Sequence, residues 1–371
     1  MSQTHATLAM REAIQKVATG PEYSKDLSQA QAHAAMRYIL SDEADPVQAA
    51  VFFIALRMKR ETDEENKGVL QAIQEASQHY QVAVDDLIDV ADPYDGHSRG
   101  LPMSAFIPTV LAACGVPAYC HGLESVGPKY GITHRKVLRA AGIDVDLTLE
   151  KAATAIADPD IGWAYLDQKI FAPKLHDLIP LRSRIIKRQV LTTVEVLVNP
   201  LRARKQTHLL TGYVHKAYPP IYASLARYAG YDSALIVRGV EGGVIPSLQQ
   251  PAKLYYYHDG AKEQSMELNP QELGIQQDSR AVPLPKDLPA DTALDEIATP
   301  FDINAAAAAA AEAGLAALKG QTGPARDALT YTTAICLHHL GRENSLASAA
   351  DAARQVLDSG KALAHFNARI G

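Results

Sequence analysis

Residues 105–120, AFIPTVLAACGVPAYC, contain the repeating unit that decides the fold class. Residues 105–114 have the length of a short helix, and the apolar run 116–120 has the length of a strand. The same alternation continues downstream, in segments of helix or strand length at residues 134–141, 143–147, 161–166, 221–228 and 234–237. Strands that alternate with helices indicate βαβ units around a largely parallel sheet.

The sheet is expected to be mixed, because residues 253–268 form two alternating runs around His258-Asp259-Gly260. Asp-Gly is a strong signal for the turn of an antiparallel hairpin. The chain then closes with long helices, which are predicted at residues 305–318, 325–340 and 345–364. Asp302 is placed to cap the first of them, whose many alanines are strong helix formers.

The N-terminal region contains helical start signals and no strand signal. Asp45 precedes Pro46 as an N-cap, and Thr62 and Glu65 form a capping box. We therefore predict an α/β protein with a small all-helical N-terminal domain, residues 1–84, completed by helices near residues 175–195. Residues 85–371 are predicted to form a large α/β domain with a mixed, mostly parallel sheet.

The composition excludes several classes of protein. A formal net charge of −6 and an isoelectric point near 6.1 argue against a generally basic nucleic-acid or membrane-surface protein. Cys114, Cys120 and Cys336 contain no CxxC pair, so neither a disulfide framework nor a cysteine zinc site is expected. No apolar run approaches the ~20 residues that cross a bilayer. We expect a reduced, cytoplasmic compartment and no membrane partner.

Several segments, taken in chain order, resemble the anthranilate phosphoribosyltransferase family. They are residues 45–50, 55–62, 121–122, 179–182, 198–201, 268–274 and 358–362. The resemblance spans nearly the whole chain. It implies a small helical domain and a large α/β domain with a ligand cleft between them, and a homodimer joined through the helical domains.

The resemblance also implies a chemistry, the transfer of a phosphoribosyl group from which pyrophosphate leaves. The family holds pyrophosphate with a glycine-rich loop and with Mg²⁺ on a later Asp-Glu pair. Here the loop is residues 92–100, where Pro93 removes a backbone donor and Tyr94 adds bulk. The segment is either a reshaped anion loop or a plain surface connection. As an anion loop, it offers the candidate ligand residues Asp95, Gly96, His97, Arg99 and the following Ser104.

The acidic pair of the family is replaced by Glu241-Gly242-Gly243-Val244-Ile245. Val244 and Ile245 have no side-chain oxygen, whereas Mg²⁺ demands hard oxygen ligands. Glu241 matches the family's first Asp and is a weak metal candidate. The sequence therefore predicts that no cofactor is required, and that Mg²⁺, if used, lacks its acidic pair. Standard transfer to anthranilate is predicted to be lost or altered.

His121, Gly122, Glu124 and Arg182 complete the candidate ligand residues. The resemblance implies a turn at His121-Gly122, although the neighbouring Lys and Asn of the family are replaced here. Glu124 either takes a new polar role or is solvated. Arg182 matches the family's arginine for the acceptor carboxylate, a role that suits its bidentate fork. Otherwise it is a surface arginine at the start of a helix.

A dense basic cluster surrounds Arg182 on this acidic chain. Its other members are Arg184, Lys187, Arg188, Arg202, Arg204 and Lys205. The cluster is either a solvated face or, opposite a cleft, a site for a carboxylate, a phosphate or a nucleic-acid backbone.

Three functions remain open from the sequence. The first is an enzyme that moves a pentosyl or phosphoribosyl group to a changed aromatic or nucleobase-like acceptor. The second is a non-catalytic, nucleic-acid-binding homodimer, like a divergent branch of the family that lacks the catalytic loops. The third is a structural or regulatory partner protein. The selective loss of the pyrophosphate and metal groups favours a cleft repurposed for another small phosphate-bearing or aromatic ligand.

Overall fold

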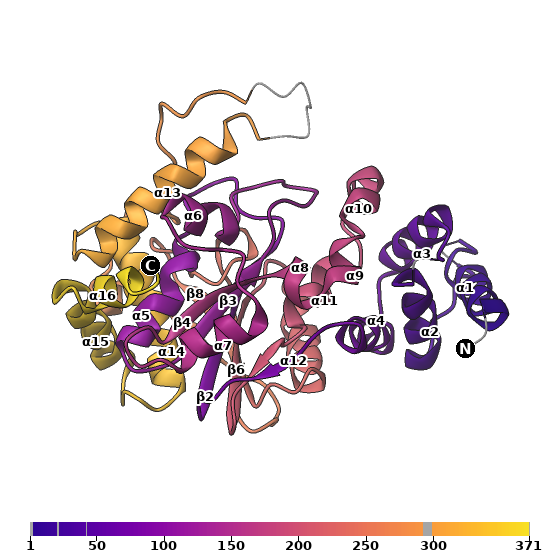
Figure 1. Cartoon of the computed structure of the whole chain (residues 1–371), viewed down its shortest axis with the longest axis horizontal. Coiled ribbons are helices and arrows are strands. Elements are labelled where there is room, and N and C mark those ends of the chain that lie inside the picture. Colours follow the sequence, from indigo (N-terminus) through magenta and orange to yellow (C-terminus); the bar gives the residue numbers. More distant parts are fainter. Residues whose placement is uncertain (1–2, 21, 42, 292–298, 371) are drawn as a thin grey trace.

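The computed structural model describes residues 3–20, 22–41, 43–291 and 299–370. A helical part, on the right in Figure 1, lies beside a larger part built around one sheet. The predicted caps are present: the Asp45 side chain accepts from two backbone N–H groups, and Thr62 and Glu65 form the capping box. The helical part consists of α1 (Gln3–Val17), α2 (Gln29–Ile39), α3 (Pro46–Lys59) and α4 (Asp63–Glu75).

Four short helices lie between the two parts (Figure 1). They are α8 (Gln168–Phe171), α9 (Pro173–His176), α10 (Ile179–Ile185) and α11 (Leu191–Val194). Helix α10 packs against α3, and α11 packs against α4. The chain therefore returns from the sheet to the helical part before it enters the sheet again.

Within the described residues, the main sheet has seven strands in the order β4-β3-β2-β6-β7-β8-β9. The neighbouring strands β4, β3, β2, β6 and β7 pair in parallel. Strand β8 pairs antiparallel with β7, and β9 pairs antiparallel with β8. The bounds are β2 (Asp86–Ala91), β3 (Ala118–Gly122), β4 (Trp163–Asp167), β6 (Gln206–Gly212), β7 (Ser233–Val237), β8 (Ala252–Tyr257) and β9 (Gln264–Leu268). A separate parallel pair consists of β1 (Tyr80–Gln81) and β5 (Leu201–Arg202). The predicted α/β class with a mixed, mostly parallel sheet is confirmed.

Different helices cover the two faces of the sheet. Side chains of β2 alternate between two cores: Leu87 and Ala91 enter one, and Ile88 and Val90 enter the other. Helices α7 (Leu149–Ala157) and α12 (Tyr218–Tyr228) cover the first core. The second lies under α5 (Ile107–Ala113), α6 (His134–Ala140), α13 (Ile303–Leu318), α14 (Pro324–His339), α15 (Leu346–Asp358) and α16 (Lys361–Asn367).

Two predictions about elements are wrong. Residues 143–147 pair with no strand among the described residues, although Ile143 and Val145 are buried. The Val145 carbonyl instead accepts a hydrogen bond from Arg135. The helix predicted over residues 345–364 is two helices, because Gly360 adopts a left-handed φ of 74° after α15.

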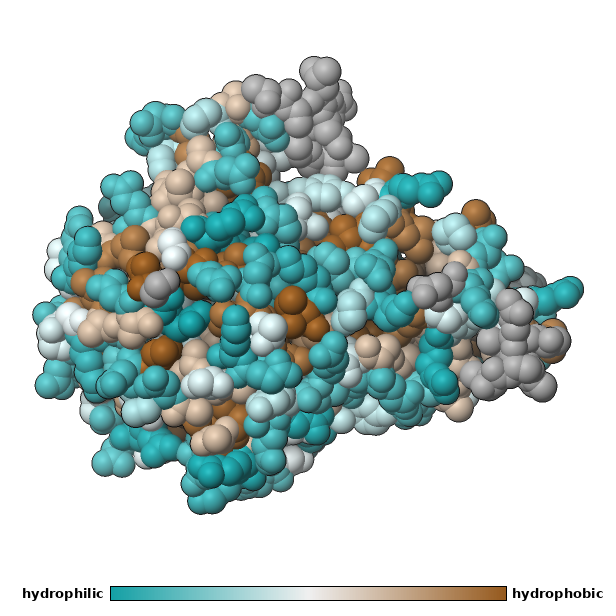
Figure 2. Space-filling model, viewed as in Figure 1, coloured by the Kyte–Doolittle hydropathy of each residue, from teal (hydrophilic) through white to brown (hydrophobic). Residues whose placement is uncertain are grey.

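Apolar side chains gather over α10 and α3 on the face shown in Figure 2. Val47 and Met58 of α3 are 68% and 79% exposed, and Ile186, after α10, is 52% exposed. None of the described helices is long and apolar enough to cross a membrane.

Candidate functional site in the cleft between the two parts

A pocket opens where the carboxyl ends of β2, β6 and β7 meet the helical part. Parallel strands present their following loops at one edge, where ligands bind in open α/β sheets. The pocket has an empty volume of about 700 Å³. Its lining includes Arg57 of α3, Thr192 and Thr193 of α11, and Asp95, Arg188, Tyr213, Tyr218, Tyr222 and Glu241. Three tyrosines make part of the lining aromatic, and two of them, Tyr218 and Tyr222, pack against each other.

The loop after β2 is anchored by a buried carboxylate, Asp92. Its Oδ2 lies 2.7 Å from His97 Nε2, 2.7 Å from Ser104 Oγ and 3.2 Å from His134 Nε2. Its Oδ1 accepts from the Val244 backbone N–H at 2.9 Å. Burial opposes ionisation, but His97 and His134 hold the pKa of Asp92 well below its ordinary value. Ser104 and His97 are therefore occupied in holding the loop.

The Glu241 carboxylate binds backbone N–H groups of this loop. Its carboxylate accepts from the Arg99 N–H at 2.7 Å and from the Ser98 N–H at 3.1 Å. Burial opposes its ionisation, but His97, Lys129 and these backbone donors together lower the pKa of Glu241. The residue adopts a left-handed φ of 56°, which is unusual for glutamate. The backbone N–H groups of Ser98 and Arg99 are thus occupied by a side chain of the chain itself.

Asp95 is paired on both sides and faces the cleft pocket. Its carboxylate accepts from Arg188 Nη2 at 2.6 Å and lies 3.2 Å from Lys129 Nζ. Neighbouring Gly96 adopts a φ of 74°, and a Cβ there would lie 2.6 Å from the carbonyl carbon of Gly131. A side chain at Gly96 would therefore push the loop off the segment that it contacts.

Tyr94 does not add bulk to the loop surface, contrary to the prediction, because its side chain is buried. Its hydroxyl lies 2.5 Å from His121 Nδ1. On the other side, His121 Nε2 lies 2.8 Å from Asp89, which also accepts from the hydroxyls of Tyr119 and Tyr231. All five side chains are buried. The His121 side chain is therefore buried and does not line the cleft pocket. The next residue, Gly122, is the last residue of β3.

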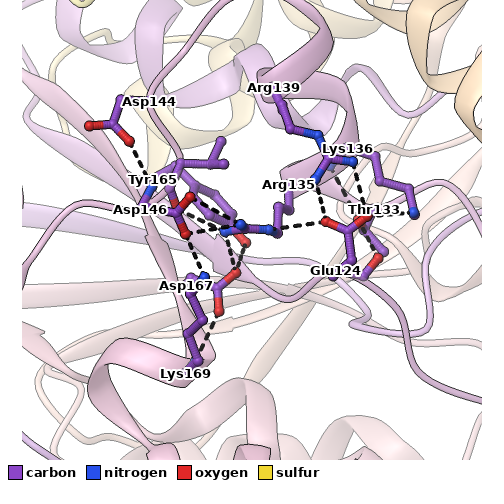
Figure 3. A network of polar contacts seen from close by, with 11 residues as sticks. Glu124, Thr133, Arg135, Lys136, Arg139, Asp144, Asp146, Tyr165, Asp167 and Lys169 are labelled. Atoms are coloured by element: carbon purple, nitrogen blue, oxygen red, sulfur yellow. Dashed lines mark hydrogen bonds and ion pairs between the residues drawn. The ribbon is translucent and has the colours of Figure 1, made fainter.

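Glu124 does not line the cleft pocket, and its side chain, 43% exposed, is paired rather than free. It joins a charged network at the ends of β3 and β4 (Figure 3). Its carboxylate accepts from Arg135, Lys136 and Arg139. Arg135 in turn donates to the buried Asp167 at 2.8 Å. The network ties the loop after β3 to α6 and to the end of β4.

This network predicts an acid-dependent stability. Partial burial opposes ionisation, but hydrogen bonds from Arg139 and Lys136 lower the pKa of Glu124 from 4.5 to about 2. A depressed carboxyl pKa stabilises the folded state above the unfolded value and loses that effect as the pH falls. We expect Glu124→Gln to unfold at a lower temperature than wild type at pH 7, with the difference shrinking between pH 4.5 and 2. Circular dichroism measures the two unfolding temperatures. A difference between wild type and Glu124→Gln that stays constant from pH 4.5 to 2 would contradict the stabilising role of ionised Glu124.

Arg182 is not a surface arginine, because its side chain is 1% exposed. It donates to the buried Glu195 through both terminal nitrogens, at 2.6 and 2.7 Å. The Arg182 guanidinium therefore binds a carboxylate, but that carboxylate belongs to Glu195 of the same chain. A ligand acid could reach Arg182 only by displacing Glu195.

The predicted basic cluster does not form one surface. Arg188 meets Asp95 beyond the carboxyl end of β2. Arg204 and Lys205 pair with Asp85, just before the amino ends of β2 and β6. The length of the strands therefore separates the two groups. Of the remaining members, Arg184 lies on α10, Lys187 lies just after it next to Arg188 in the sequence, and Arg202 lies in β5.

Sequence reasoning missed residues that the tertiary structure brings to the site. Lys129 lies near both Asp95 and Glu241, and His134 completes the surroundings of Asp92. Tyr218 and Tyr222 line the pocket from α12, and the Tyr218 hydroxyl accepts from Arg57 at 2.8 Å. A Tyr-x-x-x-Tyr spacing that places both rings on one face of a helix is the signal that could have indicated them.

The residues present do not fit a magnesium ion in the manner of an acidic pair. Val244 is buried and has no side-chain oxygen, and the Glu241 carboxylate is bound to backbone N–H groups. No group of three His, Cys, Asp or Glu side chains in the described part of the chain could hold a metal ion.

The comparison with known families follows the same two-part division. The helical bundle domain of a glycosyl transferase family matches residues 11–77, and the a/b domain of that family matches residues 98–363. The chain belongs to this glycosyl transferase family. The resemblance to the anthranilate phosphoribosyltransferase family that the sequence indicated is confirmed, and the relatives and solved structures that support it are as follows.

Anthranilate phosphoribosyltransferase of Novosphingobium aromaticivorans is 27% identical and covers 94% of this chain and 98% of its own length. An uncharacterized protein of Aquifex aeolicus is 29% identical over 73% of this chain and 77% of its own. The solved structure of anthranilate phosphoribosyltransferase from Thermus thermophilus aligns with a TM-score of 0.72 at 22% identity, over 98% of each chain. The family fold is thus retained over the whole length.

Proposed function

We propose that this family member binds a small phosphate-bearing or aromatic ligand in the cleft pocket and has lost standard magnesium-dependent transfer to anthranilate. The observation that supports the loss of standard transfer is the Glu241 carboxylate on the Ser98 and Arg99 N–H groups. A second anion at this place would meet a like charge and find its donors taken. The three tyrosines of the pocket favour an aromatic part in the ligand.

The experiment is a titration with inorganic pyrophosphate of wild type, Glu241→Gly and Glu241→Gln. Glycine suits the left-handed backbone at this position and frees both donors. We expect Glu241→Gly to bind pyrophosphate about tenfold more tightly than wild type, because a repulsive carboxylate is replaced by open N–H donors. Glu241→Gln should gain less, since its amide oxygen can still accept from the loop. Equal affinities in wild type and Glu241→Gly would contradict the proposal.

An active transferase with a changed acceptor is the second candidate. It is favoured by relatives named anthranilate phosphoribosyltransferase at 27% to 29% identity over more than 90% of this chain. Pyrophosphate release by wild type from phosphoribosyl pyrophosphate, Mg²⁺ and any of a panel of aromatic amines and bases would establish it. Release with none of them is the result that our proposal expects. Nucleic-acid binding by a non-catalytic homodimer loses support because the basic cluster is divided between two ends of the sheet.

We also propose a homodimer joined through the helical part. Val47, Val51 and Met58 expose apolar surface on one helix, α3, and burial of such surface favours association. Replacing Val47 and Met58 with Asp is expected to convert the dimer to a monomer in sedimentation experiments. A wild type that sediments as a monomer, or a dimer that survives both substitutions, would contradict this interface.

A further inference from the structure

A second recess lies on the far side of Glu241 from the cleft pocket. It is bounded by the end of β7, the start of β8 and residues 279–284, and it is open to solvent. Arg99, Arg238 and Arg280 line it together with Ser247, Pro251 and Leu284. Glu241 and Val214 line both cavities and so form the wall between them. We call this cavity the arginine recess.

The three arginines lack the carboxylate partners that other arginines near the cleft have. Arg57, Arg135, Arg182 and Arg188 each meet an Asp or Glu. Among the described residues, no ion pair joins a carboxylate to Arg99, Arg238 or Arg280, and all three are exposed to solvent. Arg280 contacts a neutral amide, that of Gln250. Like charges therefore converge on one recess without a countercharge from the chain.

The one acidic residue in the lining does not neutralise them. The Glu241 carboxylate accepts from the backbone N–H groups of Ser98 and Arg99 and lies 3.8 Å from Lys129. It is committed to the loop, and among the described residues it forms no ion pair with any of the three guanidinium groups. An anionic ligand would supply the missing countercharge, and guanidinium forks match phosphate oxygens in geometry.

Part of the remaining wall of the recess is apolar. Val214, Pro251, Ala281, Pro283 and Leu284 contribute to it. A ligand that used both kinds of wall would carry phosphate at one end and a flat or apolar group at the other. We propose that the arginine recess binds a nucleoside phosphate, with its phosphates on Arg99, Arg238 and Arg280. This site is separate from the cleft pocket and does not depend on the function proposed for the cleft.

The test is a calorimetric titration of the full chain with ATP, without Mg²⁺ and at low salt. We expect Arg238→Glu and Arg280→Glu each to weaken ATP binding at least tenfold, with affinity falling as NaCl is raised. Arg184→Glu is the matched control, since Arg184 is also exposed and has no ion pair among the described residues but lies on α10. Its affinity for ATP should remain that of wild type. Circular dichroism should give all three variants the thermal unfolding midpoint of wild type.

Arg188→Ala separates the two cavities, because Arg188 lines only the cleft pocket. ATP binding that is lost in Arg188→Ala but kept in Arg238→Glu would place the nucleotide in the cleft and overturn the proposal. Absence of wild-type binding at millimolar ATP would also overturn it. A parallel titration with a single-stranded oligonucleotide tests the other source of phosphate. Binding of the oligonucleotide without binding of ATP would exclude a small-molecule site.

Discussion

Replacement of Arg182 with alanine is expected to lower the free energy of unfolding by about 3–5 kcal/mol. The Arg182 and Glu195 side chains are 1% and 2% exposed and meet through two hydrogen bonds. Without the guanidinium, the Glu195 carboxylate stays buried with only the Gln168 amide, at 3.3 Å, as a side-chain donor. An uncompensated buried charge costs far more than a lost surface pair. Urea unfolding followed by circular dichroism measures the change.

Arg184→Ala is the matched control on the same helix. Its side chain is exposed and has no ion pair among the described residues, so we expect a change within about 0.5 kcal/mol. The double variant Arg182→Met/Glu195→Leu should recover much of the loss, because it leaves no unpaired charge. Equal stability of Arg182→Ala and Arg184→Ala would show that the ion pair does not hold α10 in place.

Replacement of Arg135 with alanine is the second large effect that we expect, again about 3–5 kcal/mol. Arg135 donates to Asp167, which is 1% exposed, and to the Val145 carbonyl in the segment that pairs with no described strand. Its loss therefore leaves a buried carboxylate and a buried carbonyl without this donor. The loops after β3 and β4 should loosen together, and hydrogen exchange at residues 143–147 should speed up.

Arg139→Ala is the control within the same network. Arg139 and Glu124 are 47% and 43% exposed, and exposed pairs contribute about 0–1 kcal/mol. A loss in Arg139→Ala as large as that in Arg135→Ala would mean that burial of Asp167 is not the cause. Unchanged hydrogen exchange at residues 143–147 in Arg135→Ala would contradict the proposed tie to that segment.

Local patterns predicted the outer elements of the fold better than its centre. Strands β3, β4 and β7 are apolar runs and were predicted, as was the β8–β9 hairpin from its Asp-Gly turn. The two central strands, β2 and β6, were not predicted. Asp89 interrupts β2, and His208 interrupts β6. Their buried side chains find hydrogen-bond partners in Tyr119 of β3, in Tyr231 of the loop before β7 and in Ser233 of β7, all distant in the sequence.

The same limit applies to the site. The sequence indicated the loops at residues 92–100 and 241–245, because motif order along the chain locates them. It could not indicate that Glu241 lies on the Ser98 and Arg99 N–H groups, since 142 residues separate Arg99 from Glu241. Glu241 also adopts a left-handed φ, and no spacing rule predicts such a conformation for glutamate.

The sequence by itself determined the two-part architecture, the helix caps and the lack of side-chain oxygens at Val244 and Ile245, because each depends on neighbouring residues or on residue type alone. Only the tertiary structure decided which carboxylate meets which cation. Arg182 is paired by Glu195, Asp95 by Arg188 and Lys129, and the basic cluster is divided by the length of two strands. Charge pairing depends on distances of a few ångströms, and packing of distant segments sets those distances.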